Sequence, residues 1–146
     1  MSRALAQAQA AFAAQEVPVG AILVAPDGKT ILAEAANAPI ANHDPTAHAE
    51  IRVLQQAAKC LGNYRLTDCT LYVTLEPCTM CAGAISHARI GHLVYGASDK
   101  KGGAVEHGVQ FFASPNCHHR PKVTGGIQSQ AAAKLLTDFF QNRRKK

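Results

Sequence analysis

The apolar positions of the chain change their spacing from one segment to the next. Residues 3–14 are rich in alanine and predict a helix, and residues 17–25 switch to an apolar, β-branched run that predicts a strand. The turn sequence Pro-Asp-Gly-Lys at residues 26–29 separates this run from a second strand at residues 30–36. These segments predict a helix followed by a β-hairpin, and they place Asn37 where a strand ends.

The middle of the chain contains two predicted helices. Residues 37–45 are irregular, and a helix opens at Pro45, where the missing N–H of proline costs nothing, and continues to about Ala58. A strand at residues 70–75 is followed by a second helix at residues 78–88. Both helices begin next to residues that can carry chemistry.

The last part of the chain adds a strand, a glycine-rich loop and an amphipathic helix. The segments are the strand 90–95, the loop 96–108, a short apolar turn 109–113, a short edge strand 122–124 and the helix 128–142. Strands that alternate with helices predict an α/β fold, and the opening hairpin makes the sheet mixed. A chain of 146 residues has the usual size of one domain, so residues 1–146 are expected to form a single domain.

The composition is that of a folded protein without a membrane segment. Apolar residues make up 47% of the chain and charged residues 17%, which excludes an intrinsically disordered chain. The alanine-rich N-terminal stretch is interrupted by Gln7 and Gln9 and lacks the apolar core of a secretory signal. Uncharged stretches elsewhere are shorter than the roughly 20 apolar residues that span a bilayer. We therefore expect a soluble, cytoplasmic protein with no membrane partner.

The net charge of +5 is distributed unevenly along the chain. Residues 1–88 hold five Lys or Arg and seven Asp or Glu, which sum to −2, whereas residues 89–146 hold ten and three, which sum to +7. This asymmetry indicates that the C-terminal half faces an anionic partner, for which nucleic acid is the commonest candidate. A basic tail that is only solvated is the alternative.

The five cysteines, at positions 60, 69, 78, 81 and 117, are an odd number in a chain without an export signal, so reduced thiols are expected. Cys78 and Cys81 form a Cys-x-x-Cys pair. By itself this pair also fits a redox site or half of a structural zinc site. A single His-x-Glu, here His48-Ala49-Glu50, is common by chance and by itself favours an ordinary surface pair.

The two motifs together indicate a catalytic zinc site. A structural site closes with four protein ligands, and the sequence offers no second Cys-x-x-Cys or histidine pair at a suitable spacing. His48, Cys78 and Cys81 supply one imidazole and two thiolates, so one zinc ion per chain keeps a fourth position for water. The positive ends of two helix dipoles favour the deprotonated sulfurs.

Glu50 is the candidate proton carrier. Zinc lowers the pKa of bound water from about 15.7 to roughly 7, which makes hydroxide available at neutral pH. Attack of hydroxide on an amino-substituted purine or pyrimidine carbon also requires a proton on the ring nitrogen and another on the departing ammonia. Glu50, two residues from His48, is placed to carry both. The alternative is an ordinary acid in the first turn of a helix.

The combined motifs resemble those of the cytidine/deoxycytidylate deaminase superfamily, whose members carry His-x-Glu and Pro-Cys-x-x-Cys. Within this superfamily, the sequence is similar to the bacterial tRNA-specific adenosine deaminases over nearly the whole chain. The segments that carry the similarity are Glu16 to Ala21, Asn42 to Ile51, Asn63 to Leu66, Thr70 to Gly83, Arg89 to Gly91, Gly96 to Lys100 and Leu135 to Arg144.

The resemblance implies a three-layer α/β/α fold with a mixed sheet of about five strands. It implies a homodimer that converts adenosine to inosine at the wobble position of a tRNA anticodon stem-loop. Asn37 matches a position that contacts the target base, and Asp99 matches one at the rim that meets the anticodon loop. Without the resemblance, they are a polar strand-end residue and a loop acid. Ala49, Arg143 and Arg144 are further candidate substrate-binding residues, the two arginines because they belong to the basic C-terminal end.

The chain departs from the family pattern near its C-terminal edge. His118-His119 and Gly125-Gly126 replace the usual residues there, which leaves an RNA contact at this edge open. Cys117 beside the two histidines imitates a second metal site, but three adjacent residues cannot easily surround one ion.

Two other functions fit parts of the sequence. A deaminase of a free base or nucleoside, of the guanine or cytosine type, would use the same zinc site. Such a small neutral substrate gives no reason for the positive charge of residues 89–146, whereas an RNA loop needs phosphate neutralisation. A non-catalytic RNA-binding subunit with a structural zinc would have no need of Glu50. The sequence therefore favours the tRNA deaminase.

Overall fold

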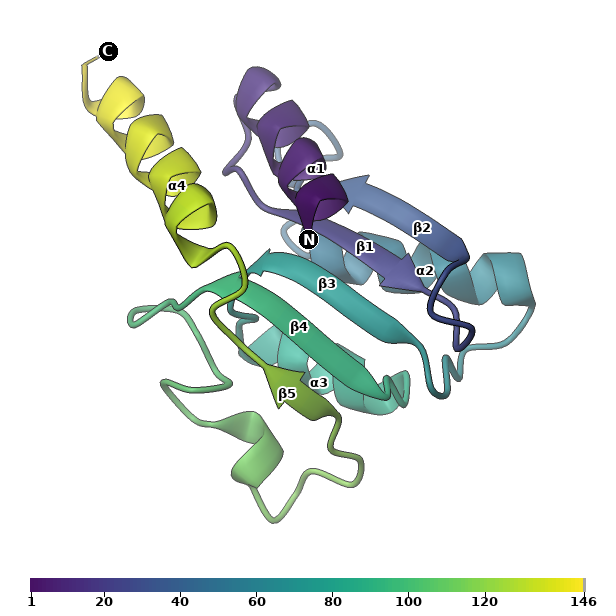
Figure 1. The fold of residues 1–146 in the computed structure, drawn as a ribbon. Helices are drawn as coiled ribbons and strands as arrows, with labels where there is room; N and C mark the ends of the chain where they lie inside the picture. The colour runs from purple at the N-terminus through teal and green to yellow at the C-terminus, as the bar shows by residue number, and fades with distance from the viewer. Residues whose placement is uncertain (146) are drawn as a thin grey trace.

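The computed structural model describes residues 1–145; Lys146, which the sequence analysis counts in the basic C-terminal half, lies outside the described residues. The helices are α1 (Ser2–Ala13), α2 (Ala49–Leu61), α3 (Thr79–His87), the short 3-10 helix η1 (Phe111–Ala113) and α4 (Ser129–Arg144). The strands are β1 (Gly20–Val24), β2 (Ile31–Ala36), β3 (Thr70–Leu75), β4 (His92–Ala97) and β5 (Lys122–Thr124) (Figure 1). Their order along the chain is the one that the apolar pattern predicts.

The strands form one sheet in the order β2-β1-β3-β4-β5. β1 is antiparallel to both of its neighbours, with Ala21 paired to Ala35 of β2 and to Val73 of β3. β3, β4 and β5 are parallel to one another. The prediction of an α/β fold with a mixed, five-stranded sheet is confirmed.

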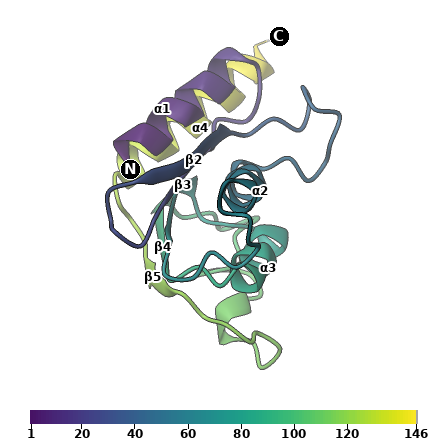
Figure 2. The same ribbon diagram turned by 90° about the vertical axis from the view of Figure 1, so that its right-hand side faces the viewer.

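Helices cover both faces of this sheet and produce three layers. α1 and α4 lie side by side on one face, and α2 and α3 lie on the other (Figures 1 and 2). Val53 of α2 and Ile85 of α3 share one buried cluster with Leu71 and Leu93 of the sheet, and all four residues are 0% exposed. Truncation of Ile85 or Leu71 to alanine would cost about 2–5 kcal/mol, because the packed neighbours cannot close the cavity completely.

The alanine content of α1 follows from how closely this helix approaches the sheet. A β-carbon on Gly20 of β1 would lie 2.1 Å from the carbonyl oxygen of Ala4 and 2.4 Å from the backbone nitrogen of Ala8. Ala4, Ala8 and Ala11 are at most 1% exposed. Small residues on both sides therefore let the helix and strand backbones meet at contact distance.

The strand directions decide where the functional segments gather. Because β1 is antiparallel to β2 and to β3, these two strands run in the same direction, and β4 is parallel to β3. The carboxyl ends of β2, β3 and β4 therefore lie at one edge of the sheet. The residues that follow these strands are Asn37, Glu76 and Ser98. This edge is where α/β sheets usually bind ligands.

α2 begins at Ala49 rather than at Pro45, where the sequence analysis placed its start. The side chain of Asp44 accepts hydrogen bonds from the backbone nitrogen and the hydroxyl of Thr46, at 2.8 and 2.7 Å. The N–H of Ala47 donates to the carbonyl of Asp44 at 3.1 Å. Pro45 thus belongs to an Asp-stabilised turn that precedes the helix.

Candidate active site

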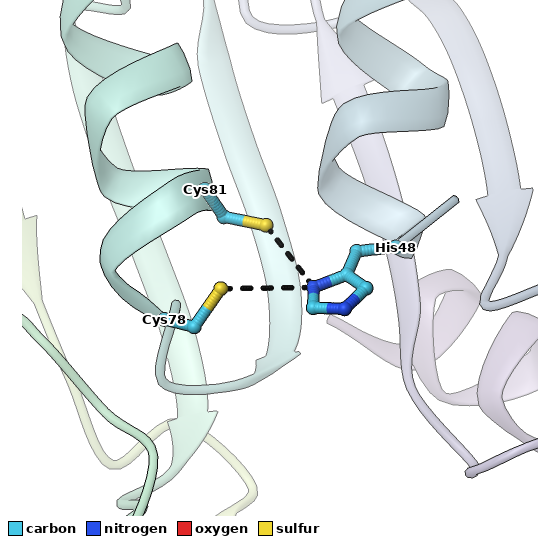
Figure 3. A group of neighbouring side chains, drawn as sticks. All are labelled: His48, Cys78 and Cys81. Carbon is cyan, nitrogen blue, oxygen red and sulfur yellow. Dashed lines mark hydrogen bonds between the residues drawn. The ribbon is translucent and has the colours of Figure 1, made fainter. Parts of the chain in front are cut away.

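The two predicted ligand motifs meet where α2 and α3 begin. His48 is the N-cap residue of α2, with φ −68° and ψ 151°, and Cys78 is the N-cap residue of α3, with φ −76° and ψ 177°. Neither side chain caps its own helix. Cys81 follows in the first turn of α3, and both sulfurs point toward the imidazole of His48 (Figure 3).

The donor atoms of these three residues have the spacing of a tetrahedral metal site. Nδ1 of His48 lies 3.7 Å from Sγ of Cys78 and 3.4 Å from Sγ of Cys81. Zinc–sulfur and zinc–nitrogen bonds of about 2.3 and 2.0 Å at tetrahedral angles require a nitrogen–sulfur separation of about 3.5 Å. The donor set therefore fits a metal ion and leaves one position for a non-protein ligand. Within residues 1–145 it is the one such group of His, Cys, Asp or Glu side chains.

The protein favours one thiolate at this site before any metal is considered. Hydrogen bonding from Cys81, together with His48, lowers the pKa of Cys78 to about 4. The same interaction raises the pKa of Cys81, which keeps the shared proton. The hydrogen bond to Cys78 raises the pKa of His48. Because cysteine binds metals as thiolate, a cation here displaces the proton of Cys81.

Glu50 lies in the first turn of α2 and is 4% exposed. Burial raises the pKa of its carboxyl group. The thiol of Cys81 interacts with this carboxyl group by hydrogen bonding, so Glu50 adjoins the metal-binding donor set. A carboxyl group in this position, with a raised pKa, is suited to take up and release a proton.

Asn37 is the first residue after β2, as the sequence analysis expects, and it is 8% exposed. Its backbone N–H donates to the carbonyl of Val19 at 2.9 Å, and the carbonyl of Ala36 accepts a hydrogen bond of 2.5 Å from Arg52 of α2. These bonds fix the strand end. Within residues 1–145 no group hydrogen-bonds to the side-chain amide of Asn37, which leaves that amide available to a ligand.

Three of the other predicted substrate-binding residues lie along a groove that the metal ligands do not line. The groove has a volume of about 930 Å³ and runs between α4 and the loop that follows β4. Its polar and aromatic lining includes Asp99, Lys100, Lys101, Phe140, Arg143 and Arg144. Four of the ten basic residues that the sequence analysis counted in the C-terminal half thus line one groove.

Ala49 and Arg143 have structural contacts of their own. Ala49 is 0% exposed and belongs to the buried core, so it presents no surface to a substrate in this structure. The guanidinium of Arg143 lies 4.9 Å from the centre of the Phe139 ring and donates to the carbonyl of Gln15 at 3.1 Å. Arg144 at the next position is exposed. Of the two arginines, Arg144 is the freer to bind an anion.

The sequence analysis assigned no role to Glu76, which directly follows the strand predicted at residues 70–75. The Glu76 side chain is 0% exposed and accepts hydrogen bonds from the loop after β4. The signal in the sequence was an acid at the end of an apolar strand, directly before the Pro77-Cys78 pair. An acid in such a position is buried and needs donors.

The cysteine and histidines near the C-terminal edge do not form a second metal site within residues 1–145. The thiol of Cys117 donates to the carbonyl of His119 at 3.1 Å. Nε2 of His119 lies 2.8 Å from the carbonyl oxygen of Ile90. The contact with Ile90 holds residues 117–119 next to the start of β4.

Comparison with known proteins shows the family to which this chain belongs. The family model described as MafB19-like deaminase matches residues 1–144. The tRNA-specific adenosine deaminase of Agrobacterium fabrum is 51% identical over 144 residues, which are 99% of this chain and 93% of that protein. This chain belongs to the tRNA-specific adenosine deaminase family. The resemblance seen in the motifs is thereby confirmed.

Solved structures of related enzymes share the fold. One, from work on A-to-I editing by tRNA:A34 deaminases at the wobble position of transfer RNA, superposes with a TM-score of 0.91 at 52% identity and covers 93% of this chain and 97% of that chain. The guanine deaminase from Nitrosomonas europaea superposes with a TM-score of 0.76 at 26% identity, over 94% of this chain and 81% of that chain. The fold therefore extends to a free-base deaminase, but the identity is higher with the tRNA deaminase.

Within residues 1–145, no helix has both the length and the apolar character needed to cross a membrane.

Proposed function

We propose that this chain converts adenosine to inosine at the wobble position of a tRNA anticodon by hydrolytic deamination. The observation that carries the proposal is the donor set of His48, Cys78 and Cys81 beside the buried acid Glu50, in a member of the tRNA-specific adenosine deaminase family. The same three residues are proposed as the ligands of one zinc ion per chain. When bound, zinc supplies a nucleophile by lowering the pKa of water to about 7.

Glu50 is the proposed proton carrier of the reaction. Deamination moves protons to the purine N1 and to the amino group that leaves as ammonia. A buried carboxyl group with a raised pKa holds such a proton more readily than an exposed one, and it releases it in a site from which bulk water is largely excluded. The ligands hold the metal, and Glu50 carries the protons.

Asn37 is the proposed contact to the target base. Its backbone is tied to Val19, whereas its side-chain amide has no partner among residues 1–145. A carboxamide presents a donor and an acceptor to a purine edge. Because β2 and β3 end at the same edge of the sheet, Asn37 and the ligand-bearing start of α3 lie on the same side of the molecule.

The groove beside α4 is the proposed surface for the anticodon stem-loop. Lys100, Lys101 and Arg144 supply positive charge for phosphates, and Phe140, which is 45% exposed, supplies a face on which an unpaired base stacks. Contacts between the stem-loop and this groove supply binding energy that positions the target base. A free nucleoside does not reach the groove and therefore lacks this binding energy. A tRNA substrate implies that the enzyme works in the cytoplasm.

We also propose that the chain forms a homodimer through the outer surface of α2 and α3. A depression there is lined by Tyr64, which is 66% exposed, and by apolar side chains of α2, of α3 and of the C-cap residue of α3: Ile51, Leu54, Ala58, Ala84 and Ala88. An apolar depression with an exposed aromatic side chain at its rim is typical of a protein–protein contact. Ala84→Glu should give a monomer in analytical ultracentrifugation, whereas Ala131→Glu on exposed α4 should not. A monomeric wild type contradicts the proposal.

The function is tested with competing substrates. Zinc-loaded protein is incubated with a stem-loop that carries adenosine at the wobble position, with a duplex of equal length, with free adenosine and with free guanine, and the products are measured by mass spectrometry. We expect the stem-loop to react fastest, since extracting a paired base costs a few kcal/mol that an exposed loop base largely avoids. Faster turnover of free guanine or adenosine would overturn the tRNA assignment.

A further inference from the structure

The carboxylate of Glu76 is the centre of a hydrogen-bond network that the proposed reaction does not use. Glu76 follows β3 and its side chain is 0% exposed. All of its partners come from residues 98–107, which we call the rim loop. They are the backbone N–H of Asp99 at 2.9 Å and Nδ1 of His107 at 2.9 Å on Oε1, and the backbone N–H of Val105 at 3.1 Å, Glu106 at 2.9 Å and His107 at 3.1 Å on Oε2.

The rim loop fits closely around this carboxylate. A β-carbon on Gly103 would lie 2.5 Å from Cδ and 2.5 Å from Oε2 of Glu76. The N–H of Ala104 donates to the carbonyl of Pro77 at 2.9 Å, so the loop is also tied to the residue before Cys78. Four backbone N–H groups of the loop donate to this carboxylate, and a carboxylate, unlike an amide, offers acceptors on both of its terminal atoms. The loop path therefore depends on the charge and shape of Glu76.

The exposed part of the rim loop, which does not contact Glu76, carries two lysines. Asp99, whose N–H is held by Glu76, accepts the N–H groups of Lys101 and Gly102 on its Oδ1 at 3.1 and 2.9 Å. Lys100 and Lys101 are exposed and line the groove opposite α4. A buried acid thus fixes a turn whose tip presents two cations to the proposed RNA surface.

We propose that Glu76 is a positioning residue for RNA binding: it anchors the rim loop on the metal-ligand side of the sheet so that Lys100 and Lys101 meet the phosphates of the stem-loop. This inference rests on the proposed function, because it takes RNA as the ligand of the groove. Glu76 contacts neither the metal donors nor the base in this role. The effect of Glu76 on RNA binding depends on the two lysines. If Glu76 only stabilised the fold, its effect on RNA binding would not depend on them.

A double-mutant cycle tests this coupling. Wild type, Glu76→Gln, the pair Lys100→Ala and Lys101→Ala, and the triple variant are compared for zinc content, stem-loop affinity by fluorescence anisotropy, salt dependence and steady-state kinetics. The lysine pair should lower the slope of log affinity against log salt by about 1.4, and Glu76→Gln by about 1 with roughly tenfold weaker binding. In these variants KM should rise as the affinity for the stem-loop falls, while kcat should stay within about twofold of the wild-type value.

The decisive comparison is the triple variant. If Glu76 acts through the lysines, Glu76→Gln adds less than about twofold to the loss already caused by the lysine pair. A full additional tenfold loss overturns the proposal. Glu16→Gln is the matched control, because Glu16 is also 2% exposed and also accepts backbone N–H groups, from Ile40 and Ala41 at 3.2 and 2.8 Å. Its effect on affinity should be the same with and without the lysines.

Two further outcomes are separated by the design. If Glu76→Gln yields no folded zinc protein, His107→Ala replaces it in the cycle. His107→Ala removes only the contact between the His107 ring and Oε1 of Glu76. Its smaller effect on stem-loop affinity must also vanish in the background that lacks the two lysines. A wild type that binds the stem-loop but forms no inosine defeats the proposed function alone, and the binding cycle still decides the role of Glu76. A wild type that does not bind the stem-loop overturns both.

Discussion

Glu50 and Glu76 are buried to a similar extent, 4% and 2% exposed, and each lies two residues from a candidate metal ligand, yet their ionisation is driven in opposite directions. Burial raises the pKa of Glu50. Burial acts on Glu76 in the same sense, but hydrogen bonds from Asp99, His107 and Val105 outweigh it and lower the pKa to about 2. Donors, rather than burial, therefore decide the direction in which the pKa of each acid moves.

The largest expected effect concerns the metal, since the role given to Glu50 requires one beside it. Cys78→Ala should lower zinc from about one ion per chain to near zero and abolish inosine formation, because two ligands do not hold the ion. Metal analysis and the stem-loop assay measure this. Cys60→Ala, which removes an exposed cysteine of α2, is the control and should keep both. Stoichiometric zinc in Cys78→Ala would contradict the ligand assignment.

Glu50→Gln should keep zinc and lose about 10²–10⁴-fold in turnover, the range for a general acid–base group. The amide keeps the shape of the carboxyl group but cannot carry the proton. Single-turnover assays on the stem-loop measure the loss, and metal analysis checks the site. Near-normal turnover by the zinc-loaded variant would assign the proton transfer to another residue and remove one side of the comparison.

Replacing each of the two carboxylates by an amide should change the Tm at neutral pH in opposite directions. The pKa of Glu76 falls from about 4.5 to about 2 on folding, so its ionised form stabilises the protein above pH 4.5, and this stability is lost as the pH falls toward 2. The full contribution is about 3 kcal/mol. Thermal unfolding of metal-free protein at neutral pH should therefore show a lower Tm for Glu76→Gln, with the difference from wild type shrinking below pH 4.5.

Glu50→Gln should shift the Tm the other way. Because the folded pKa of Glu50 is raised, its ionised form costs stability above the unfolded pKa, and a neutral isostere removes that cost at neutral pH. Metal-free Glu50→Gln should thus melt at or above the wild-type temperature, and the difference should disappear in acid. If both variants were destabilised alike at neutral pH, the contrast between the two acids would not hold.

The smallest expected effect lies at the far side of the groove. Arg144→Ala should lower the salt slope of stem-loop binding by about 0.7, the value for one phosphate contact on a single strand. Arg143→Ala should change the slope less and the Tm more, because its guanidinium packs on Phe139 and binds the carbonyl of Gln15. Anisotropy titrations and thermal unfolding measure the two. Equal salt slopes for both variants would show that Arg143 binds RNA phosphates as well as Arg144 does, in spite of its contacts with Phe139 and Gln15.

The sequence by itself determined the elements, the class of the fold and the candidate ligand set. Alternation of apolar and polar residues is a local property, so the strands and helices follow from short segments. Cys78 and Cys81 are three positions apart, and Pro45 precedes His48, which predicts that the ligands lie at helix starts. The start of α2 was misplaced, because Asp44 closes a turn around Pro45 that competes with the helix.

Only the tertiary structure decided which groups surround the side chains. The donors to Glu76 lie 23 to 31 positions away, and the acceptor of Arg143 lies 128 positions away. No local pattern reports such partners, since they depend on how strands pair and on the path of a loop. The same acid residue type is therefore the proposed proton carrier at position 50 and the proposed anchor at position 76, because the number of donors that reach a carboxylate is set by the fold.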